Sequence, residues 1–344
     1  MFYGDETLTT PVSDRNSVFV TDLIVSATGE AQLQGVVEVD WFEVPAGGRV
    51  EAVGREPFTV RAARIIINGE VDASFEGGQG SETAVGEGPG GGGISADDQN
   101  FQQQAGGGGG GYGGRGGNGG YDTNDNVPVG GTTYGSPSGL EISEGSAGGG
   151  SFGESGGAGG GALTLRGQRI TVGSGGEIRS NGRDGDNDNG NGSGGGSGGG
   201  ILLLGRVLQL DGTIEADGGN GANGGGRNSD GGGGGGGGRI KLFHEAGLFD
   251  NATVSVQPGS GGSGGSDAEG RDGQAGTIFR AEQDGVSGVL VRFGQETEFP
   301  IPDPESDNDE DDGGCGVNPR GASTLLGWLL IAGLALLAVG RRRG

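Results

Sequence analysis

The residues with the spacing of a metal site are three aspartates in the middle of the chain. Asp184, Asp186 and Asp188 stand at alternate positions, where carboxylate oxygens begin a calcium-binding loop. The sixth position of such a loop would be Asn189 in place of glycine, and the twelfth would be Gly195 in place of a bidentate glutamate. A solvated acidic turn is therefore favoured, and calcium is the one cofactor left open.

Few residues are suited to acid–base or nucleophilic chemistry. His244, which precedes Glu245, is the only histidine, so it cannot build a histidine-based metal cluster. No serine has the strand–turn–helix context of a hydrolase nucleophile, and copies of Gly-x-Gly-x-x-Gly arise by chance in a chain with 92 glycines. The best carboxylate pair is Glu177 with Glu215, if the two stack on adjacent repeats. The sequence predicts no enzyme and no catalytic residue.

Glycine and short apolar runs determine which elements position these residues. Only 30% of the 344 residues are hydrophobic, and they gather in runs of Val, Ile and Leu separated by glycine-rich stretches. Such runs are typical of short strands joined by loops, and the absence of a sustained Gly-X-Y period excludes a collagen triple helix. We therefore expect an all-β fold.

A strand–turn–strand unit recurs along the chain. It spans 64–78, 169–182 and 206–219, and a degenerate copy starts at Ala252. Arg169 and Arg206 are 37 residues apart whereas 105 residues separate Arg64 from Arg169, so the repeat is kept in the strands and not in the loops. Fixed units with variable insertions are typical of a solenoid whose insertions leave on one side.

The turns between the strands leave the pairing open. Asn68-Gly69 and Asp211-Gly212 fit the corners of a parallel solenoid, where glycine permits a positive φ, but such pairs also mark antiparallel hairpins. Because the strands are short and the units resemble one another, we favour a parallel β-helix over a sandwich of hairpins.

Four glycine-rich insertions, at 77–161, 182–200, 218–238 and 259–276, separate the units. Two structures remain open for them. One is flexible coil, since glycine loses much entropy on ordering. The other is a set of extended, polyproline-II-like segments packed side by side, where only glycine lets backbones approach closely.

The charge distribution limits the partners. Formal net charge is −25 and Lys241 is the only lysine, so nucleic-acid binding is not expected. Residues 297–314 combine prolines with a dense acidic run, which predicts an extended spacer.

The C-terminus has the pattern of a membrane anchor. Residues 322–339 form an uncharged stretch of 18 residues, followed by Arg341, Arg342 and Arg343. This length is near the lower limit for a transmembrane helix, and the arginines predict a cytoplasmic C-terminus with the body outside. Export requires a signal that Met1–Val20 does not show, so we expect the natural start to lie upstream.

The acidic linker, Cys315 among glycines, the apolar stretch and the three arginines together resemble the C-terminal sorting segments of bacterial surface proteins. The resemblance is nearest to the MYXO-CTERM type of myxobacteria and covers about 30 residues, although many members carry two cysteines and this chain has one. It implies a tail held in the inner membrane, cleavage near Cys315 by an intramembrane sorting protease, and transfer to the cell surface. The repeat body separately resembles glycine-rich right-handed β-helix regions of bacterial surface proteins.

The expected architecture is a parallel, right-handed β-helix or solenoid with glycine-rich loop insertions and one C-terminal transmembrane helix. Its regions are 1–60 for the opening strands, 61–296 for the repeats, 297–320 for the acidic linker and 321–344 for the sorting segment.

The expected function is that of a non-enzymatic protein anchored at the cell surface, with a structural, adhesion or matrix-contact role. Its partners would be the membrane and a surface glycan or matrix. The alternative is a β-helix lyase or hydrolase acting on polysaccharide. An elastic, ice-covering or surface-covering protein is a third possibility, favoured if the glycine segments are ordered and flat.

Overall fold

The computed structural model describes residues 20–95, 105–121, 127–151, 154–186, 190–226, 229–249, 251–265 and 268–282. These residues form two parallel β-sheets and no helix. Sheet A contains β1 (Val20–Ile24), β3 (Val36–Val44), β5 (Phe58–Ile67), β7 (Ala162–Val172), β9 (Gly200–Leu210), β11 (Arg239–His244) and β14 (Thr277–Glu282), with β12 (Ala246–Leu248) beside β9. Sheet B contains β2 (Glu30–Leu33), β4 (Arg49–Ala52), β6 (Glu70–Asp72), β8 (Glu177–Arg179), β10 (Thr213–Glu215) and β13 (Thr253–Ser255).

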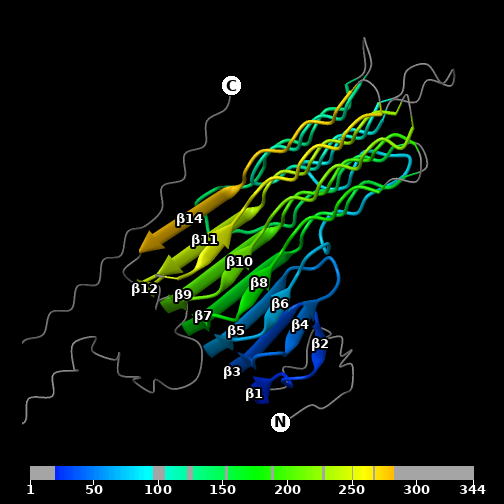
Figure 1. Ribbon diagram of the computed structural model, residues 1–344. Helices are drawn as coiled ribbons and strands as arrows, with labels where there is room; N and C mark the ends of the chain where they lie inside the picture. The colour runs from blue at the N-terminus through cyan, green and yellow to red at the C-terminus, as the bar shows by residue number, and fades with distance from the viewer. Residues whose placement is uncertain are drawn as a thin grey trace, which may run out of the picture. The chain divides into compact units, whose positions relative to one another are not determined.

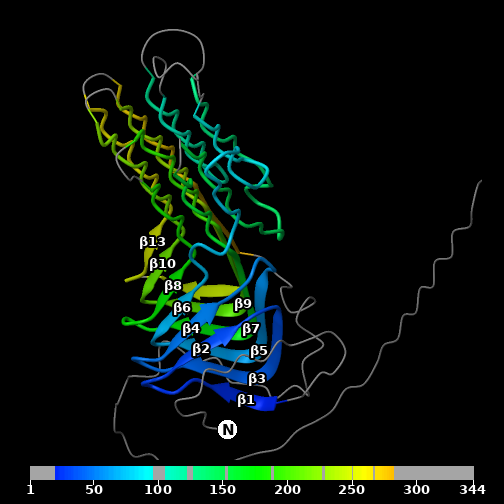
Figure 2. The same ribbon diagram turned by 90° about the vertical axis from the view of Figure 1, so that its right-hand side faces the viewer.

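From β1 to β10 the chain alternates between the two sheets, so each sheet A strand and the sheet B strand after it form one coil of a solenoid-like stack, and in the next coil β11 and β12 of sheet A precede β13 of sheet B (Figures 1 and 2). Every pairing between the strands above is parallel. The expected parallel arrangement is confirmed, and for the described residues the hairpin sandwich is wrong.

Apolar side chains lie between the sheets in rows that cross the coils. On sheet A, Ile65 pairs in register with Ile170, which pairs with Leu208, and all three are fully buried. On sheet B, Ile178 lies between Val71 and Ile214. One coil alone offers few such residues, so the core exists only because the coils stack.

The register corrects the predicted repeat by one residue. Arg64 pairs with Arg169 as expected, but Arg169 pairs with Val207 and not with Arg206. Gln168 in β7 and Arg206 in β9 lie opposite each other without pairing, and partners are 38 residues apart both before this position (Ala162 with Gly200) and after it (Arg169 with Val207). The sequence repeat therefore aligned Arg169, which pairs with a residue of β9, with Arg206, which pairs with no residue of β7.

The corner glycines act by close packing, not by left-handed geometry. Gly69 and Gly212 do not have the positive φ that the sequence suggested. A Cβ on Gly69 would lie 2.2 Å from the carbonyl oxygen of Gly48, and one on Gly212 would lie 2.2 Å from that of Gly176. Glycine is required because each turn lies directly on the turn of the coil before it.

The insertions leave from one side of the stack, as predicted. They follow the sheet B strands β6, β8, β10 and β13 and lead back into sheet A at β7, β9, β11 and β14. Figure 1 shows these glycine segments running side by side beyond the strands. We call the described parts of 77–161, 180–200, 216–238 and 256–276 the glycine bundle.

Hydrogen bonds within the glycine bundle have a period of three residues. Gly106, Gly107 and Gly108 each donate to a different neighbouring segment, and the next three residues donate to the same three segments in turn. The acceptors are Gly120, Gly192 and Gly93, then Gly117, Gly195 and Gly90, at 2.8–2.9 Å. A polyproline-II helix has three residues per turn and no internal hydrogen bonds. The packed, polyproline-II-like form is therefore the one present, and flexible coil is wrong for these residues.

The run Gly231–Gly238 shows why no side chain is tolerated along this part of the bundle. A Cβ on any of its eight residues would lie 1.9–2.3 Å from a carbonyl oxygen of another segment. The oxygens surround the run, since successive positions face residues near 262, 193 and 117. Eight consecutive glycines are thus a packing requirement.

Candidate functional surface

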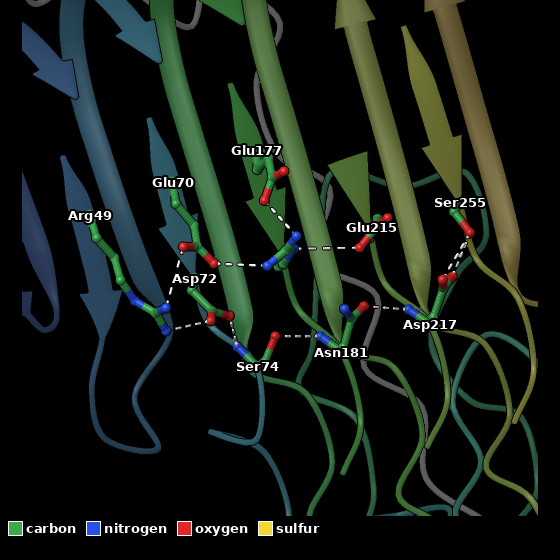
Figure 3. A network of polar contacts seen from close by, with 10 residues as sticks. Arg49, Glu70, Asp72, Ser74, Glu177, Asn181, Glu215, Asp217 and Ser255 are labelled. Carbon is green, nitrogen blue, oxygen red and sulfur yellow. Dashed lines mark hydrogen bonds and ion pairs between the residues drawn. The ribbon is translucent and has the colours of Figure 1, made fainter. Parts of the chain in front are cut away.

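The outward face of sheet B carries a network of charged side chains (Figure 3). Its first centre is Arg49 on β4, which contacts Glu30, Glu70 and Asp72 at 3.5, 3.3 and 2.8 Å. Alternation along the strands places Val50 in the core and its neighbours outside, so these residues come to one face by the period of two.

The second centre is Arg179 on β8. Its guanidinium lies 3.0 Å from Glu70, 2.5 Å from Glu177 and 3.5 Å from Glu215. Glu70 therefore joins the two arginines, and the network spans strands β2 to β10. Ion pairs this exposed contribute little each, about 0–1 kcal/mol, so the network mainly fixes how the coils align.

Glu177 and Glu215 do not stack as the sequence suggested. Glu177 pairs in register with Thr213, while Glu215 pairs with Arg179. The turn before β8 has four residues and the turn before β10 has two, which shifts the two strands relative to the sequence repeat. The carboxylates are separated by a guanidinium that contacts both, so neither is available as an unpaired acid or base.

A row of short polar side chains continues this face onto the glycine bundle. At every third residue a side-chain oxygen accepts the backbone N–H of the next segment. The pairs are Asp217 N–H to Asn181, Asn220 N–H to Asp184, Gln257 N–H to Asp217, Ser260 N–H to Asn220 and Ser263 N–H to Asn223, at 2.6–2.9 Å. These oxygens replace backbone acceptors at the edge of the bundle, where a side chain has room to project.

The candidate calcium ligands are divided by this arrangement. Asp184 accepts the N–H of Asn220 at 2.6 Å, and Asp186 lies 3.7 Å from Arg183. Asp188 is outside the described residues. Within the described part of the chain, no three His, Cys, Asp or Glu side chains are grouped as a metal site.

His244 is the last residue of β11 and is buried. Its ring lies 5.1 Å from that of Phe249, and among the described residues neither ring nitrogen has a hydrogen-bond partner. Burial lowers its pKa, which favours the neutral ring. No serine lies within hydrogen-bond distance of it in the described chain, so a Ser-His-acid arrangement has no support.

Two buried cations on the outward face of sheet A were not singled out by the sequence. Arg239 donates to the carbonyl oxygen of Tyr134 at 2.9 Å, and Lys241 donates to those of Gly139 and Glu141 at 2.9 and 2.5 Å. Burial lowers the pKa of Lys241. Because its ammonium is engaged by carbonyl groups, the lysine clamps the segment 134–142 to the sheet and presents no free amine.

Some predicted sites fall outside the described residues. They are Cys315, Arg341, Arg342, Arg343 and the predicted span 322–339. Within the described residues, no helix has the length and apolar character to cross a bilayer. Searches with the sequence and the structure found no matching protein family, curated protein or solved structure.

Proposed function

We propose that the protein is a non-enzymatic surface component with a structural, adhesion or matrix-contact role. The observation that supports this most strongly is the three-residue hydrogen-bond period of the glycine bundle. It makes a long, ordered body from segments that would otherwise be flexible, and that body is held at one side of the coils. A rigid, extended body suits a role in display or contact, and such a role requires no catalytic pocket.

The finer architecture belongs to the same proposal. The body is a right-handed β-solenoid with glycine-rich insertions, followed by the acidic linker and a transmembrane helix at 322–339. The protein is exported and held with its body outside, and it is cleaved near Cys315 by a sorting protease. Mass spectrometry of cell-surface fractions tests this, because an intact Arg341–Gly344 on the exposed protein contradicts processing.

Amide hydrogen exchange tests the rigid-body role. The interior amides of 231–238 donate to neighbouring segments at 2.7–3.0 Å, so we expect slow exchange there. Exchange of 231–238 within the dead time of the experiment would remove the basis for the structural role.

A polysaccharide lyase or hydrolase is the alternative, with Glu177 and Glu215 as its best carboxylates. The ion pairs of both with Arg179 argue against it. The test is product release from acidic and neutral glycans by the full chain and by its Glu177→Gln and Glu215→Gln variants. Turnover by the parent chain that is lost in either variant would replace the non-enzymatic proposal.

The ordered bundle also favours a surface-covering role. Side chains project from its edge at every third residue, about 9 Å apart along each segment, and so form a regular array on neighbouring segments. Thermal hysteresis and adsorption to crystalline polysaccharide test this reading. Equal results with Asn220→Tyr, which disrupts the array, would argue against it.

A further inference from the structure

The outward face of sheet A holds a group of arginines in a strongly acidic protein. Strands β5, β7 and β9 contain five arginines and no aspartate or glutamate, although the whole chain has 46 acidic residues. Four of the arginines lie on two adjacent strands, with Arg61 opposite Arg166 and Arg64 opposite Arg169. Adjacent strands are about 4.8 Å apart, so each pair places two positive charges side by side.

Such an arrangement is electrostatically unfavourable by itself. Like charges directly opposite each other on neighbouring strands destabilise a sheet. Arg61 is compensated by Glu38 at 2.7 Å, and Arg206 by Glu245 at 3.0 Å. Among the described residues, Arg64, Arg166 and Arg169 have no carboxylate within 4.0 Å. The other face differs, since Arg49 and Arg179 each contact three carboxylates.

The neighbours of the three uncompensated arginines suit a sugar. Trp41 pairs in register with Arg64, whose guanidinium lies 4.8 Å from the centre of the indole ring. Thr171 on β7 belongs to the same outward-facing set and is partly exposed, whereas Thr164 is buried. A hydroxyl such as that of Thr171 can bind the hydroxyls of a glycan, whereas the indole N–H of Trp41 is buried and has no partner among the described residues.

Where the outward face of sheet A is apolar, another segment of the chain covers it. In the row that contains Arg166, the next positions are Leu204 and Phe243. These two are buried and packed with Ile142 from the clamped segment 134–142. The arginines, in contrast, are partly exposed. The chain therefore covers the apolar part of the face and leaves the basic part accessible.

We propose that Arg64, Arg166 and Arg169, with Trp41, form a binding site for the oxyanions of an acidic glycan. Planar guanidinium groups match carboxylate and sulfate oxygens with paired hydrogen bonds. A linear glycan with an anionic group on successive sugars would lie across β5 and β7 and replace the repulsion between the arginines with ion pairs. The proposal goes beyond a structural role, because a purely structural protein would fail the binding test and keep its slow hydrogen exchange.

The test is calorimetric titration of the full chain with oligogalacturonate, with a sulfated oligogalactose and with neutral oligogalactose of the same length. We expect binding of an anionic oligosaccharide and none of the neutral one, and the two anionic arms distinguish carboxylate from sulfate recognition. Affinity should fall as salt rises. The double variant Arg64→Gln/Arg169→Gln should lose about tenfold or more in affinity, since charge-assisted hydrogen bonds are removed.

The matched control is Arg271→Gln, which removes the same charge from an exposed position on the glycine bundle and should leave affinity within about twofold. Arg166→Gln removes one like-charge pair, so its thermal midpoint should be equal to or above that of the parent while its affinity falls. Loss of binding is then separated from loss of folding.

Four results would overturn the proposal. They are no binding of either anionic oligosaccharide, equal binding of the neutral one, equal loss in the Arg271→Gln control, and equally tight binding of duplex DNA. Binding that appears only after the acidic side chains of 305–312 are neutralised would assign the face to the chain's own acidic segment and also overturn it.

Discussion

The coils and the glycine bundle are both ordered, but their interiors are packed in different ways. In the coils, side chains such as Phe42 and Ile65 fill the space between two sheets and are fully buried. In glycine runs of the bundle such as 231–238, the interior has no side chains, and backbone amides donate to neighbouring segments on every side. The first region depends on the hydrophobic effect, and the second depends on hydrogen bonds and close backbone contact.

The comparison shows why the two regions occur together. Glycine loses more conformational entropy on ordering than any other residue, and each backbone hydrogen bond returns only about 0.5–1.5 kcal/mol. The glycine segments gain from having both ends fixed, because each insertion starts in sheet B and ends in sheet A. The coils therefore set the register of the glycine segments, which a run of identical residues cannot specify by itself.

Ile178→Ala tests this dependence and should have the largest effect. Ile178 is fully buried between Val71 and Ile214, so its truncation should lower the free energy of unfolding by about 2–5 kcal/mol. Chemical denaturation measures the loss, and hydrogen exchange should show faster exchange in both coils and bundle. Ile178→Val, at about 0.5–1.5 kcal/mol, is the matched control. Unchanged protection of 231–238 in the alanine variant would show that the bundle stands without the coils.

Gly235→Ala tests the other region. Its Cβ would lie 2.0 Å from the carbonyl oxygen of Gly196, a backbone atom that cannot move alone. We expect a loss of about 1–3 kcal/mol or more, with faster exchange in the bundle and little change in the coils.

The control for the bundle variant is Gly175→Ala. The nearest atom to its Cβ would be 3.6 Å away, which is ordinary contact. Stability should stay the same or rise by less than about 1 kcal/mol, because alanine restricts the unfolded chain. Equal losses in the two alanine variants would contradict the close packing of the bundle.

Asn220→Ala examines the border of the bundle, where a side chain takes part. It removes the acceptor of the Ser260 N–H at 2.9 Å, and since Asn220 is exposed we expect a loss of only about 0.5 kcal/mol. Exchange of the Ser260 amide should become faster. Asn220→Asp keeps the oxygen and should preserve the slow exchange, so equal exchange in the alanine variant would remove this role for the side chain.

The coils were largely predictable because their information is local. Alternation in stretches such as Arg169–Val172 predicts strands, and the similarity of the units predicts parallel stacking. The register was missed by one residue, since the sequence repeat was aligned on Arg169 and Arg206, whereas Arg169 pairs with Val207. The positions of Glu177 and Glu215 were missed for the related reason that their turns differ in length.

The bundle was predictable in kind but not in detail. A glycine run carries no side-chain pattern, so Gly231–Gly238 does not reveal which segments it contacts. A signal did exist at the edge, where Asn220 and Asn223, and likewise Ser260 and Ser263, are three residues apart. That spacing is informative only once a helix of three residues per turn is assumed. The arginine face was missed because the repeat units were taken to begin at Arg64 and Arg169, which left out the second pair on the same strands, Arg61 with Arg166.

A change of pH should distinguish the two regions with the smallest perturbation. His244 in the coils has a pKa lowered chiefly by burial, with the charge of Arg280 acting in the same direction and that of Glu282 opposing. The unfolded chain therefore takes up a proton below about pH 6.5 that the folded chain resists, and stability is lost as pH falls from 6.5 toward the lower folded pKa.

The run 231–238 of the glycine bundle contains only glycine, whose amide groups do not titrate in this range. Between pH 7 and pH 5, amides of β11 and β14 should lose protection, after correction for intrinsic exchange, before those of 231–238 do. His244→Phe keeps the ring contact with Phe249 and removes the titrating group, so it should flatten the dependence for β11 and β14. If the pH dependence of exchange in β11 and β14 persists in that variant, carboxylates and not His244 determine the acid sensitivity of the coils. The difference in pH response between the two regions would then come from their ion pairs.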